Sequence, residues 1–262
     1  FTGWTLEHYI PSRKIDISKT LIHEYFKDVW GFGDFDHSQC QYLLNFIAWM
    51  LQFPASRSHR IVCLVSKCQG NGKSSLFRIL DMIFSGFTSF HVDLSTYLQT
   101  FNISACCKKV IFIDDVFGAT QQEVRRMLPK ASCGIQKYRK KNEGDVDMKE
   151  YSEVFTTSNQ KAPLHMKPNS RRQLMLQASE LKLMDRDFFS KMKCSTRDLD
   201  IAKAWFDFFK HRNIDKFSPE QNPDTGFRGE VVEACMVKSH IFLTRFFSDP
   251  EWFSSYKHEG LN

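Results

Sequence analysis

"SKCQGNGKSSL", residues 66 to 76, decides the fold of this chain. It lies between a short apolar run, "RIVCLVS" at residues 60 to 66, and a segment with helical periodicity, "SSLFRILDMIF" at residues 74 to 84. A strand, a glycine-rich loop and a helix in this order are the context in which Gly-Lys-Ser binds phosphate. The stretch therefore predicts a phosphate-binding loop. Its cradle consists of Gln69, Gly70, Asn71, Gly72, Lys73, Ser74 and Ser75.

One position of the loop departs from the motif. The pattern opens with a glycine, four residues before Gly-Lys-Ser or Gly-Lys-Thr, and Lys67 stands at that place. Because Lys67 lies at the entrance of the loop, it alters the first turn and leaves Gly70 and Gly72 in place for close approach to phosphate. The alternatives are a glycine-rich turn that matches the motif by chance, or a loop with altered nucleotide affinity.

Buried strands recur along the chain and end in polar residues. Residues 60 to 66 are apolar without alternation, which is typical of a strand covered on both faces. "KKVIFIDDV" (108 to 116) is predicted as a second such strand that ends in two carboxylates, and "YSEVFTTSN" (151 to 159) as a third that ends in polar residues. Since helical patterns separate them, we expect an α/β fold with a parallel sheet flanked by helices. Ligands of such sheets lie beyond the carboxyl ends of the strands, so the three polar endings are expected to meet at one edge.

Helical segments flank this predicted sheet on both sides in the sequence. Residues 18 to 54 hold two helical patterns separated by Gly31-Phe32-Gly33, and aromatic-rich helix follows residue 185. We therefore predict an N-terminal helical segment over residues 1–55, a core over 56–180 and a mainly helical region over 181–262. At 262 residues and 42% hydrophobic content, the chain is able to bury a substantial core.

Charge and cysteine content bound the class of protein. Between Lys108 and Lys141 there are nine basic residues and three acids. This local excess of +6 equals the net charge of the whole chain. The eight cysteines show no Cys-x-x-Cys spacing, so we expect reduced, mostly buried thiols in an intracellular protein. No membrane span or signal peptide is recognisable, which predicts no membrane partner. Because the chain begins at Phe1, we expect a fragment of a longer polypeptide.

The polar residues at the strand ends are those that ATP hydrolysis needs. Lys73 suits the β- and γ-phosphates of ATP, and Ser74 offers a hydroxyl to Mg²⁺. Of the carboxylates Asp114 and Asp115, the first is expected to hold Mg²⁺ and the second to orient the attacking water. Asn159 is placed to reach both the γ-phosphate and that water. Taken singly, an acidic pair is usually a solvated turn, and a terminal Asn is usually a cap.

Arg171 and Arg172 follow Asn159 by twelve and thirteen residues. A guanidinium that stabilises the transferring phosphoryl group accelerates the reaction strongly, and a neighbouring subunit of a ring is able to supply it. The alternative is a plain surface pair. The sequence does not say which of the two arginines takes the role.

The order Lys73-Ser74, Asp114-Asp115, Asn159 and Arg171-Arg172 resembles that of the superfamily 3 helicases, especially the primase-helicases of phages, poxviruses and other large DNA viruses or mobile elements. The resemblance covers roughly residues 20 to 230. It implies a phosphate-loop ATPase of the AAA+ type that assembles as a homo-hexameric ring on single-stranded DNA. It also implies a primase domain N-terminal to this fragment, and action in the host nucleus or at a cytoplasmic replication site.

In such rings a hairpin before the third strand projects into the channel, and "GIQKYRKKNEGDVDMKEY" (134 to 151) occupies that position here. Lys137, Arg139, Lys140 and Lys141 are expected to engage phosphates, and Tyr138 to stack on a base. The alternative is a hairpin whose basic residues form only a solvated face.

The sequence thus predicts an ATP-dependent replicative DNA helicase. The alternatives are a nucleic-acid-binding ring module that has lost ATP hydrolysis, with Lys67 as the sign of that loss, or an ATPase that acts on RNA or in genome packaging. Phosphate contacts and base stacking serve DNA and RNA equally, so the residues do not separate the two.

Overall fold

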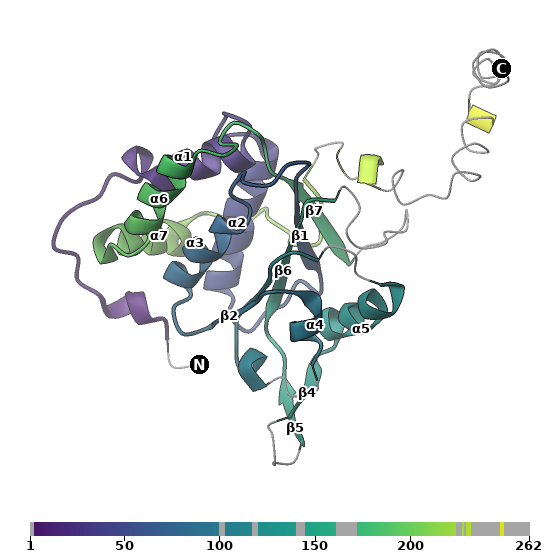
Figure 1. The fold of residues 1–262 in the computed structure, drawn as a ribbon. Helices are drawn as coiled ribbons and strands as arrows, with labels where there is room; N and C mark the ends of the chain where they lie inside the picture. The colour runs from purple at the N-terminus through teal and green to yellow at the C-terminus, as the bar shows by residue number, and fades with distance from the viewer. Residues whose placement is uncertain are drawn as a thin grey trace, which may run out of the picture.

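A five-stranded parallel sheet forms the centre of the molecule (Figure 1). The computed structural model describes residues 3–99, 103–116, 120–139, 145–160, 172–223, 227, 229–231 and 247–248. The strands, in spatial order, are β2 (Thr88–His91), β3 (Val110–Ile113), β6 (Glu153–Ser158), β1 (Ile61–Val65) and β7 (Gln173–Gln177). All neighbouring pairs are parallel, which confirms the predicted α/β fold with helices around a parallel sheet.

Helices cover both faces of this sheet. The helices are η1 (Thr5–His8), η2 (Ile17–Lys19), α1 (Leu21–Tyr25), η3 (Phe26–Trp30), α2 (Ser38–Gln52), α3 (Ser75–Ile83), α4 (Leu94–Tyr97), η4 (Ile103–Ala105), α5 (Gln121–Ser132), α6 (Arg186–Ser195) and α7 (Leu199–His211). Alternate residues of β1 point to opposite layers, with Val62 and Leu64 facing α2, α3 and α7, and Cys63 facing α4 and α5. Both sides of β1 are therefore buried, which explains its unbroken apolar sequence.

Both edge strands were missed by the sequence patterns. β2 and β7 have the sequences "TSFH" and "QLMLQ", which are short and mix polar with apolar residues. An edge strand has one neighbour only, so its sequence is less constrained than that of a central strand. The predicted strand over residues 108 to 116 is shorter in the structure, because Asp115 takes a left-handed conformation, with φ of 51°, just after β3.

One hydrophobic cluster joins the three predicted regions of the chain. It contains Trp30 and Phe46 from the N-terminal segment, Phe155 from the sheet, and Trp205 and Phe209 from the C-terminal helices. The rings of Phe46 and Phe155 meet at 6.0 Å between centroids, in an edge-to-face arrangement. The three regions separated by the predicted boundaries at residues 55 and 180 therefore share one hydrophobic core.

A separate two-stranded antiparallel sheet extends away from the helical layers (Figure 1). It consists of β4 (Ile135–Arg139) and β5 (Asp145–Lys149), with Tyr138 opposite Val146. Its position before β6 confirms the hairpin predicted over residues 134 to 151. Lys140 and Lys141 lie outside the described residues.

The prediction of mostly buried cysteines is wrong for the part of the chain that the structure describes. Seven cysteines in that part are free thiols, and Cys40 and Cys63 are buried. The exposed ones are Cys107, Cys133 and Cys194, which lie in a turn or at helix ends, where a small side chain needs no apolar surroundings. In these same residues, no helix is both long enough and apolar enough to cross a membrane.

Candidate functional site

The loop between β1 and α3 has a backbone that requires glycine at two positions. Gly70 and Gly72 have φ angles of 80° and 87°, in the region that side chains disfavour. A Cβ atom at Gly70 would lie 2.5 Å from the sulfur of Met184, and one at Gly72 would lie 2.3 Å from the ring of Phe189. The start of α6 thus packs directly on the loop and holds its shape.

The backbone N–H groups of residues 69 to 74 are without acceptors within the described part of the chain. They are followed by helix α3, whose first turn closes with a bond from the Ser75 N–H to the Gly72 carbonyl at 3.0 Å. Free N–H groups at a helix N-terminus carry partial positive charge and bind anions. The loop therefore has the geometry of an anion-binding site.

Lys73 is held at the centre of this cradle by side-chain acceptors. Its ammonium donates to Ser66 Oγ, to Asn159 Oδ1 at 2.7 Å and to Asn71 Oδ1 at 3.1 Å. The side chain is buried, and burial lowers the pKa of Lys73 to about 8, an effect that the Asp114 and Asp115 carboxylates oppose. A phosphate in the cradle would add negative charge and favour the protonated form.

Ser74 and Asp114 form the second pair of the site. Asp114 Oδ1 accepts hydrogen bonds from Ser74 Oγ at 2.7 Å and from Thr157 Oγ1 at 2.5 Å. A hydroxyl and one carboxylate are hard oxygen ligands, and Mg²⁺ is usually bound by one or two carboxylates together with water and phosphate. The pair is thus a small oxygen set of the kind that Mg²⁺ uses.

Asp115 stands at the open edge of the site. Its side chain is exposed, and its N–H donates to Thr157 Oγ1 at 2.9 Å. A left-handed conformation in a residue other than glycine is strained and tends to occur where function requires it. Thr157 therefore orders both members of the acidic pair, because it also donates to Asp114.

The three polar strand ends meet as the sequence predicts. β3, β6 and β1 are neighbours, so Asp114, Asn159 and the loop lie at the same edge of the sheet. The sequence patterns missed Ser66 and Thr157, which support Lys73 and the acidic pair respectively. Thr157 left a weak signal, since it is one of the polar residues that follow the apolar pair Val154-Phe155 in β6.

Arg172 lies at the opposite edge of the sheet from the loop. Its carbonyl accepts the N–H of Ile61, at the amino end of β1, at 2.8 Å. The five residues of β1 separate this end from the loop, at roughly 3.3 Å per residue. The exposed Arg172 side chain therefore does not reach the loop of its own chain. Arg171 lies outside the described residues.

The expected role of Tyr138 on the hairpin is wrong. Only 4% of Tyr138 is exposed, and its hydroxyl donates to Glu150, so the ring is not free to stack on a base. Arg139 is paired with Asp145 through two bonds, at 2.5 and 2.8 Å, and Lys137 lies opposite Asp147 in the register. Two of the three basic residues on the described strands, Lys137 and Arg139, thus lie opposite carboxylates, which the count of basic residues did not reveal.

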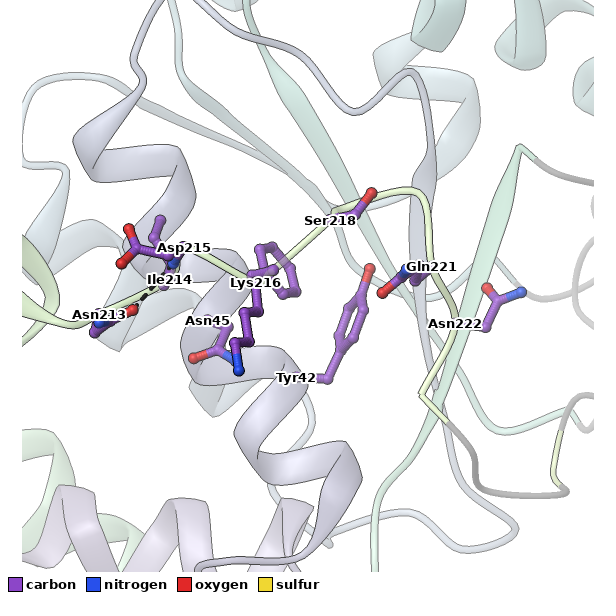
Figure 2. A pocket seen from close by; sticks show the side chains of 10 residues that line it. Tyr42, Asn45, Asn213, Ile214, Asp215, Lys216, Ser218, Gln221 and Asn222 are labelled. Carbon is purple, nitrogen blue, oxygen red and sulfur yellow. Dashed lines mark hydrogen bonds between the residues drawn. The ribbon is translucent and has the colours of Figure 1, made fainter.

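A hollow of about 500 Å³ lies away from the loop, where Tyr42 and Asn45 of α2 face the segment of residues 213–222 (Figure 2). Arg60 holds this segment by donating to the carbonyls of Pro219 at 2.9 Å and Gln221 at 3.0 Å. The lining is mainly amide, hydroxyl and aromatic groups. None of the residues that line the hollow belongs to the loop, which remains the candidate site.

Comparisons with known proteins agree with this fold. Residues 64–172 match a family of unknown function (DUF5906). Among curated proteins, no sequence matches this chain. Three similar solved structures are of the NrS-1 C terminal region, with TM-scores of 0.77, 0.76 and 0.75 at 15%, 18% and 15% identity. Each alignment covers 100% of this chain and 63%, 62% and 63% of the respective structure, so this chain spans less than two thirds of their length.

Proposed function

We propose that this chain is the ATP-hydrolysing motor of a replicative DNA helicase of the superfamily 3, AAA+ type. The single observation that carries the proposal is the arrangement at the carboxyl edge of the sheet. There, free N–H groups surround Lys73, which contacts Asn159, beside a Ser74–Asp114 pair. Phosphate binding, metal binding and positioning of water are thus available within one site, as phosphoryl transfer requires.

Each residue has a proposed task in hydrolysis. The N–H groups of residues 69 to 74 and the Lys73 ammonium bind the β- and γ-phosphates of ATP. Ser74 and Asp114 hold Mg²⁺, which neutralises charge on the phosphates when it is bound. Asp115 and Asn159 orient the attacking water. Because Arg172 lies at the far edge of the sheet, its proposed action is on the phosphate of a neighbouring copy in a ring.

The partner that we propose is single-stranded DNA, with RNA as the other polynucleotide that the same contacts would bind. The proposed phosphate contacts are the basic residues of the hairpin, Lys137, Arg139, Lys140 and Lys141. Steady-state ATP hydrolysis with and without single-stranded DNA tests the function. We expect turnover that rises when DNA is added, and an absence of turnover under both conditions would contradict the proposal.

Lys67→Gly tests whether the loop is intact as it stands. The Lys67 side chain is exposed at the loop entrance and is not among the groups that hold Lys73. We expect nucleotide binding to change by no more than about 1–2 kcal/mol, the size of a backbone or single-contact effect. Isothermal titration with a non-hydrolysable ATP analogue measures it. A several-hundred-fold gain in ATPase activity would instead favour the ring module that has lost hydrolysis.

Asp115→Asn tests the separation of binding from hydrolysis. The exposed carboxylate makes no part of the phosphate cradle, and its backbone bond to Thr157 stays in the variant. ATP affinity is therefore expected to remain, while turnover falls by about a hundredfold or more because the attacking water is no longer oriented. Binding and turnover are measured on the same preparation. Lost ATP affinity would contradict the role assigned to Asp115.

A further inference from the structure

A groove of about 500 Å³ lies between η1, α3 and the turn that joins α6 to α7. Its floor is apolar and includes the buried side chains of Leu6, Met82 and Ala202. Cationic side chains stand around that floor. They are Arg78 of α3, Lys193 of α6 and Arg197 of the turn.

The three cations of this groove form neither an ion pair nor a side-chain hydrogen bond with any other described residue. Asp81, a carboxylate that also lines the groove, accepts a hydrogen bond from Thr88. With three cations against this one carboxylate, the groove presents a net positive charge around an apolar floor. Such a surface fits an acidic segment that carries a large apolar side chain.

The aromatic ring in the groove is poorly placed for a nucleobase. Phe77 packs against Phe90 and Phe112, with ring centroids 5.0 and 5.4 Å away. Its ring is thus already in contact with two rings of the same chain, whereas single-stranded nucleic acid is usually held by open aromatic faces. The charge and the apolar floor together favour a protein segment as the occupant.

The loop "GFGDFD", residues 31–36, has the complementary chemistry. Phe32 is 42% exposed and has a φ of 53°, a conformation that is unusual for a bulky side chain. Asp34 and Asp36 are exposed, and neither forms an ion pair with a described cation. The loop is held rigid by bonds from the Asp34 N–H to the Gly31 carbonyl at 2.9 Å and from the Gly33 N–H to Lys27 at 3.0 Å.

The loop and the groove lie at different ends of α6. A Cβ atom at Gly33 would be 3.4 Å from Leu181, in the turn before α6, whereas Lys193 lies in the last turn of that helix. The ten residues of α6 span about 15 Å, so a loop does not fill the groove of its own chain. A contact between loop and groove therefore joins two different copies. In the proposed ring this contact is heterologous, with the loop of each copy in the groove of the next.

We propose that Phe32 of one copy enters the groove of the next, with Asp34 and Asp36 facing Arg78, Lys193 and Arg197. The rigid loop loses little freedom on binding, which favours association. The head-to-tail arrangement presupposes a ring and therefore rests on the proposed function. The contact itself depends on surface charge and shape, so it is measured without ATP or DNA.

Paired charge reversals test the contact by sedimentation velocity over a range of protein concentrations. The loop variant is Asp34→Lys with Asp36→Lys, and the groove variant is Arg78→Glu with Arg197→Glu. Each alone places like charges together and is expected to weaken self-association at least about tenfold. An equimolar mixture is expected to recover it, because the reversed loop then meets the reversed groove and each native loop meets a native groove.

Two further variants complete the test. Phe32→Asn keeps the left-handed backbone and removes the apolar anchor, so it is expected to weaken association at unchanged net charge. Asp215→Lys with Lys216→Glu reverses exposed charges elsewhere and is expected to leave association unchanged. Circular dichroism melting checks that every variant is folded.

Several outcomes would overturn the contact. The first is a wild-type chain that stays monomeric at about 100 μM, a concentration that detects even weak pairing. The others are charge reversals that do not change self-association, and an equimolar mixture that does not recover it. If the groove variant loses DNA affinity and self-associates normally, the groove binds nucleic acid instead. The measurements are repeated in a Lys73→Ala background. Suppose that the charge reversals weaken self-association in that background and their mixture restores it, while the wild-type chain shows no ATP turnover. This result would refute the proposed function and leave the contact standing.

Discussion

Lys73→Ala is expected to abolish ATP hydrolysis while leaving the fold intact. The Lys73 ammonium is the charge at the centre of the loop, and it is held there by Ser66, Asn71 and Asn159. Its loss removes the positive charge that stabilises the phosphates in the transition state, so turnover should fall by about a hundredfold or more. The hydrophobic cluster around the sheet does not include Lys73, so the thermal unfolding transition should remain cooperative.

The matched control is Lys67→Ala, which removes a lysine from the same loop at an exposed position. It is expected to retain most of the turnover, because the free N–H groups and Lys73 are unchanged. ATPase rates and melting curves of the two variants are compared in parallel. Unchanged turnover in Lys73→Ala, or equal losses in both variants, would contradict the assignment of the site.

The second large effect is expected at the arginine pair. Either Arg171→Ala or Arg172→Ala should reduce ATP turnover by about a thousandfold or more and leave nucleotide binding unchanged. The structure gives the reason for expecting this only in an assembly. Arg172 lies beside Ile61 at the amino end of β1, on the edge away from its own loop. The isolated chain should therefore hydrolyse ATP poorly at low concentration and better when it assembles on single-stranded DNA.

Mixing the inactive arginine variant with Lys73→Ala protein tests action between subunits. At equal amounts, about one quarter of the interfaces combine an intact loop with an intact arginine from the neighbour. Partial ATPase activity is expected to return. Mixing the arginine variant with a chain that carries both substitutions is the control, since no interface is then complete. If mixed rings form and activity does not return, the arginine pair is surface charge.

The sequence alone determined the central part of the fold and the chemistry of the loop. An unbroken apolar run, a glycine-rich loop and an amphipathic helix are local patterns, and they predicted β1, the loop and α3 within one or two residues. The polar ends of β3 and β6 were predicted in the same way. Parallel strands place such ends at a common edge, so the nearness of Lys73 to Asn159 followed from pattern and topology.

Only the tertiary structure decided which side chains are exposed and which charges remain unpaired. By sequence, Tyr138 lies in a basic hairpin. In the structure its ring is buried, and its hydroxyl donates a hydrogen bond to Glu150, twelve residues away. Thr157 orders the acidic pair across the space between two neighbouring strands. Phe189, more than a hundred residues from Gly72 in sequence, packs on the loop. Burial and pairing depend on such contacts between distant segments, and the period of a local sequence carries no information about them.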